Sequence, residues 1–374
     1  MKSPGLYIHV PFCRSKCGYC DFYSETSPER IPFFLNALLM EMKHDLGPFG
    51  TFDTVYMGGG TPSLLKPKEL EGVFSGVHDH FDISDESEVT LESNPADLKP
   101  DYLRALRNMG VSRLNIGVQS FHQPTLDFLG RRHGVQEART AIDWARKAGF
   151  DNLGLDLIYG VPGMNIDIWV DSLMTALFFE PEHLSCYQLS LSSQTPLGKT
   201  LHEGGFSLPD EDLSLQYFVK TSEILEGTGY IHYEVSNYAK DISLVSRHNQ
   251  KYWDHSPYLG LGPGAHSFLN KERWWNHRSI VRYAGDLERG ERPMEGRELL
   301  SPADLILESL FLSLRTRKGI DLMEFRKTNN LDLEKEKRET LQRLEAGGFI
   351  VIRDGRLSPT LRGYAMADSL PLIL

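Results

Sequence analysis

Residues 9–20 read HVPFCRSKCGYC. Three of the four cysteines in the chain, Cys13, Cys17 and Cys20, lie in this stretch with the spacing C-x3-C-x2-C. Thiolates are the usual protein ligands of iron–sulfur clusters. One short loop can contact three corners of a four-iron cube, which leaves the fourth iron free to bind a small molecule. The stretch therefore predicts a 4Fe–4S cluster with one open iron.

A structural zinc site with His9 as the fourth ligand is the alternative. Structural zinc sites prefer C-x2-C pairs and four closed ligands. The sequence contains no second cysteine pair, because Cys186 is isolated and falls in an expected strand. Cys186 is interpreted as a small buried hydrophobic residue. The spacing thus favours the cluster over zinc.

Around the cysteine loop, strand patterns alternate with helical patterns through the first two hundred residues. Six such units predict an α/β fold of parallel strands joined by crossover helices. A closed barrel needs eight units, so we expect an open, partial (βα)6 barrel with its site at the C-terminal strand ends. The clearest expected helices are Pro32–Leu46, Pro100–Met109 and Val135–Ala148. The expected strands are Leu6–Val10, Thr54–Met57, Glu88–Glu92, Arg113–Gly117, Asn152–Ile158 and His183–Leu189.

Beyond the barrel, the helix and strand periodicity of the sequence is weak to about residue 290 and becomes distinct again from Ser301. We expect the barrel domain over residues 1–235, a connecting region over 236–295 and a C-terminal module over 296–374. Irregular structure with short elements is expected over roughly 190–290. In the module, three helices, the first starting at Ser301-Pro302, and a hairpin turning at Asp354-Gly355 resemble a winged helix.

Composition and net charge argue against several classes of function. The net charge of −11, from 51 acidic and 40 basic residues, argues against a nucleic-acid partner. Residues 301–374 hold 12 basic and 11 acidic side chains, which favours a packing or lid module over a DNA reader. No apolar run approaches the ~18 residues of a membrane span, and the first residues lack the apolar stretch of a signal peptide. We expect a cytoplasmic protein.

A second loop extends the pattern to a known superfamily. Residues 58–63 read GGGTPS and follow the second expected strand. With the C-x3-C-x2-C loop after the first strand, this arrangement resembles the radical SAM superfamily. The resemblance implies that S-adenosylmethionine (SAM) binds the open iron and that the glycine loop meets its methionine end.

Three further stretches resemble one branch of that superfamily, the coproporphyrinogen III dehydrogenase-like proteins. They are residues 92–95 (ESNP), 117–121 (GVQSF, with Arg131 downstream) and 156–163 (DLIYGVPG). The resemblance implies that Tyr19 stacks near the adenine or shields the cluster. It also implies a SAM pocket lined by Tyr7, Gly59, Gly60, Thr61, Glu92, Gln119, Arg131, Asp156 and Gln188.

Two features separate the chain from porphyrinogen-oxidising enzymes. Those enzymes add a cysteine where this chain has Phe22, and they carry an N-terminal extension that we expect to be missing, since the first strand starts at Leu6. Residues 248–253 read HNQKYW, which resembles the bacterial haem chaperone family called HemW. Imidazole is a common haem ligand and aromatic rings offer flat faces. The resemblance implies haem contacts by His248, Tyr252 and Trp253, with His266 and Trp274-Trp275 as further candidates. The alternative is a structural loop in which His248 bonds locally and Trp253 fills core.

The expected function is therefore haem binding and delivery to apo-haem acceptor proteins such as respiratory enzymes. The family suggests a homodimer, and peripheral membrane contact is compatible with a membranous acceptor. The alternative is a catalytic radical SAM enzyme, either an oxygen-independent coproporphyrinogen III oxidase or another hydrogen-abstracting enzyme. A zinc- or nucleic-acid-binding module is a third, remote class.

Overall fold

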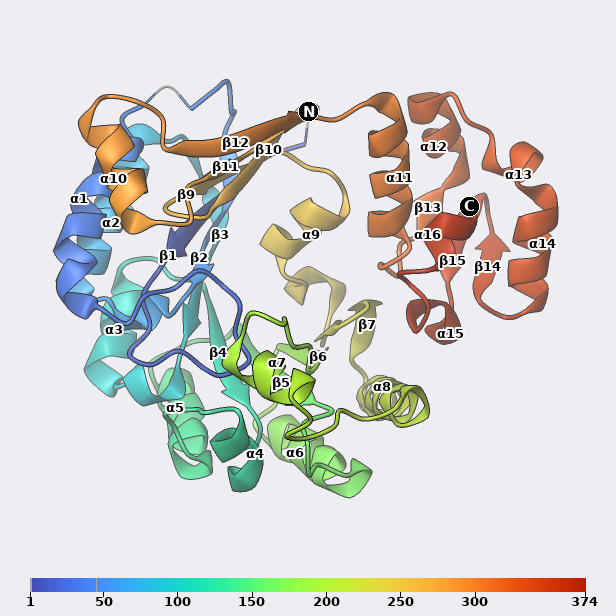
Figure 1. Ribbon diagram of the computed structural model, residues 1–374, viewed down its shortest axis with the longest axis horizontal. Helices are drawn as coiled ribbons and strands as arrows, with labels where there is room; N and C mark the ends of the chain where they lie inside the picture. Colours follow the sequence, from blue (N-terminus) through green and yellow to red (C-terminus); the bar gives the residue numbers. More distant parts are fainter. Residues whose placement is uncertain (1, 45) are drawn as a thin grey trace.

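The computed structural model describes residues 2–44 and 46–374 and is organised around one twelve-stranded sheet (Figure 1). Six of its strands are parallel and adjacent in chain order, so the predicted partial (βα)6 barrel is confirmed. Most of their side chains are buried, as expected when helices cover a parallel sheet, except in the first half of β3 and at the end of β6. The strands are β1 (Gly5–Val10), β2 (Phe52–Gly59), β3 (Ile83–Ser93), β4 (Arg113–Gln119), β5 (Leu153–Tyr159) and β6 (His183–Gln188).

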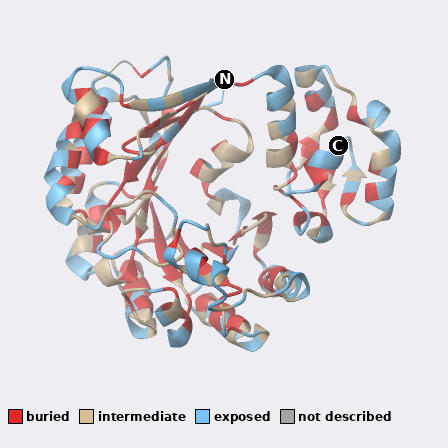
Figure 2. Cartoon of the chain, viewed as in Figure 1, coloured by how far each residue is buried: buried red, intermediate tan, exposed pale blue. Residues whose placement is uncertain are grey.

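Helices cover the outer face of these strands, and Figure 2 shows the buried residues gathered on the strands and on the inward helix faces. Several start with proline in the first turn, where its missing N–H costs nothing. The helix expected over Pro32–Leu46 ends earlier, at Glu41, and Asp45 lies outside the described residues. The helices are α1 (Ile31–Glu41), α2 (Pro67–His80), α3 (Pro100–Asn108), α4 (Gln123–Phe128), α5 (Val135–Lys147) and α6 (Ile166–Phe178). Short 3-10 helices are η1 (Pro28–Arg30), η2 (Pro62–Leu64), η3 (Pro95–Asp97) and η4 (Ile242–Leu244).

The short elements expected over roughly 190–290 are present, but most of that segment is regular helix and strand instead of irregular structure. Strands from it extend the barrel sheet at both ends: β8 and β7 continue from β6, and β9 to β12 continue from β1. The short strand β9 is parallel to β1, with Gly5 opposite Tyr258. The elements are α7 (Pro196–His202), α8 (Glu211–Gly227), β7 (Ile231–Glu234), β8 (Asn237–Ala239), α9 (Arg247–Trp253), β9 (Tyr258–Leu261), β10 (His266–Leu269), β11 (Glu272–Asn276), α10 (Ile280–Glu288) and β12 (Met294–Leu299).

A buried carboxyl group ties this added sheet to the barrel. Glu41, at the end of α1, accepts hydrogen bonds from Gly262 N at 2.8 Å, Asn276 Nδ2 at 2.6 Å and the Tyr283 hydroxyl at 2.6 Å. Burial raises the pKa of Glu41 to about 7. These bonds fix the loop after β9 beside the end of β1.

The C-terminal module has its own small core and the expected hairpin, which a further strand extends into a three-stranded antiparallel sheet (Figure 1). Its first helix is capped by Ser301, whose hydroxyl accepts from Asp304 N. The sequence predicts the third helix over about Leu333–Glu345, and the structure divides it in two at Lys337. Among the described residues no helix has the length and hydrophobicity to cross a membrane. The elements are α11 (Pro302–Ser313), β13 (Ile320–Asp321), α12 (Leu322–Asn329), α13 (Leu333–Glu336), α14 (Arg338–Ala346), β14 (Ile350–Arg353), β15 (Arg356–Pro359), α15 (Leu361–Tyr364) and α16 (Leu370–Ile373).

Candidate cluster and S-adenosylmethionine site

The cysteine loop leaves the C-terminal end of β1 and returns alongside it. Cys13 N donates to Glu25 O at 3.0 Å, and Glu25 N donates to Pro11 O at 2.8 Å, which closes the loop at its base. Cys20 N donates to Cys17 O at 3.2 Å, so the last two cysteines share a tight turn. All three thiols are free and partly exposed. The fold therefore presents them together on one loop at the barrel mouth.

Two side chains from other loops, one after β2 and one after α4, direct donors at these sulfurs. The Thr61 hydroxyl donates to Cys13 Sγ at 3.4 Å, and Arg131 Nη1 donates to Cys17 Sγ at 3.4 Å. Burial raises the pKa of Cys20 to about 11, so this thiol keeps its proton unless a metal replaces it. Hydrogen bonds to sulfur are the means by which proteins stabilise metal-bound thiolates. The donor set fits a cluster held by three cysteines.

His9 is not free to complete a zinc site. Its Nδ1 lies 3.1 Å from the Tyr7 hydroxyl and its Nε2 lies 2.8 Å from Tyr23 O, so both ring nitrogens are engaged. The ring is 5% exposed, and burial lowers its pKa to about 4. The part of the chain that the structure describes holds no group of three or more His, Cys, Asp or Glu placed around a single metal ion.

The glycine loop after β2 packs directly on the cysteine loop. Gly59 has a φ of +103°, and a Cβ there would lie 2.5 Å from the His9 ring. A Cβ on Gly60 would lie 2.7 Å from the carbonyl oxygens of Val10 and Phe12. Both positions therefore require glycine, because any side chain would push the two loops apart. The backbone of this loop is thus held against the base of the cluster loop.

Two partly buried carboxyl groups come from neighbouring parts of the barrel, Glu92 near the end of β3 and Asp156 in the middle of β5. Glu92 accepts from the Tyr56 hydroxyl at 2.7 Å and from Gly59 N at 3.3 Å, and burial raises its pKa to about 7. Asp156 accepts from Asn115 Nδ2 at 2.6 Å, and burial raises its pKa also. Carboxyl groups in such a site gain most from a cationic ligand. The ammonium and sulfonium groups of SAM have that chemistry.

Arg131 and Gln119 complete this edge of the barrel. Arg131 donates to Gly117 O at 2.8 Å and to the Tyr19 hydroxyl at 3.4 Å. Its Nε is buried and has no hydrogen-bond partner among the described residues. Gln119, at the end of β4, has a φ of +68°, a left-handed conformation that costs a side-chain-bearing residue free energy. An unpartnered guanidinium donor and a strained backbone are features that a bound carboxylate ligand would explain.

The ninth predicted residue of the SAM pocket, Gln188, lies away from the two carboxyl groups. Gln188 is exposed at the end of β6 and donates to Ser214 Oγ of α8 at 3.1 Å. Within residues 2–44 and 46–374 it makes no hydrogen bond to Glu92 or Asp156. Sequence reasoning missed Tyr56 and Asn115, which orient the two carboxyl groups. Asn115 carried a usable signal, because it is a polar residue inside a buried apolar strand.

The HNQKYW segment forms α9, and His248 lies at its buried face. His248 Nδ1 is 2.9 Å from Thr54 Oγ1, and its Nε2 is 2.9 Å from the Tyr252 hydroxyl. The ring is 1% exposed and stacks on Tyr56 with centroids 5.0 Å apart. Burial lowers its pKa to about 3, so the imidazole is neutral. His248 could coordinate haem iron only after one of these two hydrogen bonds breaks. In the present structure it holds the Tyr252 side chain in place.

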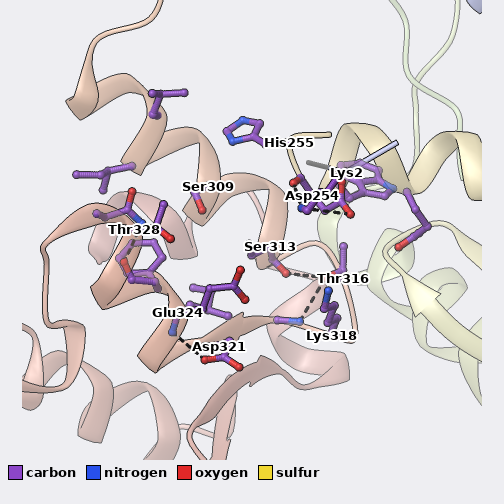
Figure 3. A pocket seen from close by; sticks show the side chains of 18 of the residues that line it. Lys2, Asp254, His255, Ser309, Ser313, Thr316, Lys318, Asp321, Glu324 and Thr328 are labelled. Atoms are coloured by element: carbon purple, nitrogen blue, oxygen red, sulfur yellow. Dashed lines mark hydrogen bonds and ion pairs between the residues drawn. The ribbon is translucent and has the colours of Figure 1, made fainter. Parts of the chain in front are cut away.

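The remaining motif residues line two different pockets. Tyr252 lines a pocket of about 380 Å³ together with Tyr7 and residues 21–23 of the cluster loop. Trp253 lines a pocket of about 480 Å³ between α9 and the C-terminal module (Figure 3). Figure 3 shows polar side chains of α11 and α12 around this second pocket. The Trp253 indole N–H is buried without a partner in the described chain.

A partial barrel whose first strand opens into a three-cysteine loop defines a radical SAM protein. Residues 7–176 match the radical SAM superfamily, and residues 300–366 match the HemN C-terminal domain. Coproporphyrinogen III oxidase from Escherichia coli shares the fold, with a TM-score of 0.86 and 20% identity, over 99% of this chain and 89% of that one.

Relatives with higher sequence identity identify the family within this superfamily. The heme chaperone HemW of Mycobacterium tuberculosis is 35% identical, over 98% of this chain and 93% of its own length. The heme chaperone HemW of Bacillus subtilis is 33% identical, over 87% of this chain and 86% of its own length. The chain belongs to the HemW family. The superfamily implies a 4Fe–4S cluster and SAM, and the residues described above fit both.

Proposed function

We propose that this protein is a cytoplasmic haem chaperone that binds haem and delivers it to apo-haem proteins such as respiratory enzymes. The names of its relatives support the proposal. The observation that carries it is the position of Tyr252, which brings the HNQKYW helix into the same pocket as the cluster loop. Clustered free thiols suit a reducing compartment.

In this proposal Cys13, Cys17 and Cys20 hold the 4Fe–4S cluster. The pocket residues named above hold SAM, with Arg131 on its carboxylate and Glu92 and Asp156 on its ammonium or ribose hydroxyls. A reduced cluster of this kind supplies the electron that cleaves SAM. Haem transfer proceeds without that cleavage, so the cluster and SAM act as structural, redox or dimer-forming elements.

The HNQKYW helix contributes three residues to haem binding in different ways. Tyr252 faces the pocket beside the cluster loop, and His248 holds its hydroxyl at 2.9 Å. Trp253 lines the neighbouring pocket, and its indole N–H is buried without a partner among the described residues. The predicted haem contacts of all three residues form part of the proposal.

Anaerobic purification and cluster reconstitution, followed by haem titration and gel filtration, test the proposal. We expect a saturable Soret band that comigrates with the protein and moves to an apo-haem protein such as apomyoglobin on mixing. Transfer should be equal with SAM and with a non-cleavable SAM analogue. A cluster-loaded protein that retains no haem on gel filtration would overturn the proposal.

The acceptor and a second copy of the chain are the proposed protein partners. Light scattering of the cluster-loaded and cluster-free protein measures whether a dimer forms and whether it needs the cluster. Binding to vesicles with and without an embedded acceptor separates membrane contact from acceptor contact. A monomer under every condition would remove the dimer from the proposal.

The intact carboxyl pair and the unpartnered Arg131 Nε favour one alternative, a catalytic radical SAM enzyme. Substrate-dependent release of 5′-deoxyadenosine under reducing, anaerobic conditions is its test. Coproporphyrinogen III is the first substrate to examine, although Phe22 replaces the added cysteine of the porphyrinogen-oxidising enzymes.

A further inference from the structure

The pocket of about 380 Å³ beside the cluster loop has walls from segments far apart in the sequence. Strand β1, the cluster loop, α9, β9, β10 and the segment before α10 all contribute. Its size lies within the range of small-molecule sites. The residues on which the inference rests are Tyr7, Phe22, Tyr252, Tyr258, His266 and Arg278.

Two histidines line this pocket, and they differ in availability. Both nitrogens of His9 are engaged, by the Tyr7 hydroxyl and by Tyr23 O. His266, the first residue of β10, is exposed, and neither of its ring nitrogens has a hydrogen-bond partner among the described residues. Its ring stacks on Trp275 with centroids 5.7 Å apart and planes 25° apart, which limits the directions its nitrogens can take. An oriented, unpartnered imidazole at a pocket wall is a ready metal ligand.

The other walls suit a flat apolar molecule. Tyr252 and Tyr258 pack edge to face with centroids 4.8 Å apart. Phe22 is 62% exposed, although large apolar side chains usually avoid water. Aromatic rings pack on porphyrin faces through dispersion and burial. A haem macrocycle in this pocket would cover Phe22 and contact both tyrosines.

The Arg278 side chain provides a positive charge beside the pocket, which suits the propionate edge of haem. Arg278 is exposed, and its Nη2 donates to the backbone oxygen of Asp21 at 2.9 Å. It forms no ion pair with a carboxylate in the described part of the chain, while the Asp21 carboxylate also borders the pocket. A guanidinium group with unused N–H donors can pair with a propionate.

We propose that this pocket binds haem with His266 as the axial ligand of the iron and Arg278 paired with a propionate. The inference rests on the proposed function and adds to it the residues that hold the cargo. It replaces the proposed haem contacts of two residues: His248 becomes a positioning residue for Tyr252, and Trp253 lines the neighbouring pocket. Haem in this pocket lies against the cluster loop, so the cluster and the cargo are neighbours.

The test titrates ferric haem into the cluster-loaded wild type and three variants, His266→Ala, His248→Ala and His78→Ala. His78 is an exposed histidine on α2 and serves as the matched control. We expect His266→Ala to weaken binding by at least about tenfold, the scale of ligand-shell effects on metal affinity. The electron paramagnetic resonance spectrum of bound haem should change in His266→Ala and stay unchanged in His78→Ala.

A second arm tests Arg278 with haem and with haem dimethyl ester, which has no free propionate. Arg278→Ala should weaken haem binding by about two- to fivefold, the range of exposed ion pairs, and leave the ester unaffected. If wild type binds no haem, the proposed function fails. If wild type and His266→Ala bind haem equally with the same spectrum, this inference fails while the proposed function stands. Loss of the ligand signal in His248→Ala alone would move the ligand to His248.

Discussion

Arg131 Nη1 lies 3.4 Å from the sulfur of Cys17. A positive charge so near a proposed cluster ligand would favour the reduced, more negative state of the cluster. Arg131→Met should therefore lower the reduction potential, by about 40 mV for an effect of about 1 kcal/mol. A redox titration followed by electron paramagnetic resonance measures it. Arg107→Met, on the outer helix α3, is the control, and equal potentials in the two variants would contradict the expectation.

Glu92 makes the stability of the SAM-free protein depend on pH. Because burial raises its pKa from 4.5 to about 7, the folded chain keeps a proton that the unfolded chain releases. Stability is therefore lost as the pH rises from about 4.5 to about 7, by at most on the order of 3 kcal/mol. Glu92→Gln should lose less Tm between pH 5.5 and 7.5 than wild type or the exposed-site control Glu71→Gln. Parallel Tm profiles in all three proteins would refute this role.

His248→Ala and His266→Ala should differ in stability. His248 is buried and bonded to Thr54 and Tyr252, so its removal leaves two hydroxyl groups without their partner. A buried unsatisfied group costs about 1–3 kcal/mol, and a drop in Tm of several degrees should follow. Exposed substitutions are usually within about 0.5 kcal/mol of wild type, so His266→Ala should melt like wild type. Equal melting of the two variants would show that His248 does not support α9.

The left-handed backbone conformation of Gln119 lowers the stability of the folded chain. Gln119→Gly should relieve the left-handed strain at φ +68° and raise stability by about 1 kcal/mol, whereas Gln119→Ala should not. Both variants should bind SAM more weakly, since both lack the amide. Thermal denaturation and equilibrium dialysis with labelled SAM give the two readouts. A lower Tm for the glycine variant than for the alanine variant would exclude strain at this residue.

Local sequence patterns predicted the six barrel strands and the cysteine loop because each is encoded within a few neighbouring residues. The strand bounds differ from the expected ones mainly at the ends, as with β3, which begins at Ile83 instead of Glu88. Helix α8 was missed because its apolar residues do not form a clear stripe. Strand β9 was missed because four residues carry little pattern of their own and depend on β1 for pairing.

The site was predictable to a similar degree. Residue types and spacing predicted the cysteines as cluster ligands, and the resemblance to the radical SAM superfamily predicted the role of the glycine loop. The bonds of Tyr56 to Glu92 and of His248 to Thr54 link residues from different elements, so no spacing in the sequence reveals them. The sequence does not show which histidine ring is available. Only the structure shows that His248 is hydrogen-bonded on both nitrogens, whereas His266 has no such partner among the described residues.

The pairing of β1 with β9 also constrains the order in which the chain folds during its synthesis. Ribosomes deliver Gly5 long before Tyr258, so the strand that carries the cysteine loop waits unpaired on one edge through most of synthesis. Contacts so distant in sequence form late and slowly. The cysteine loop thus stays accessible from the β9 side while the first half of the barrel assembles. If Cys13, Cys17 and Cys20 hold a cluster as proposed, we expect iron and sulfide to enter this loop most readily before β9 docks.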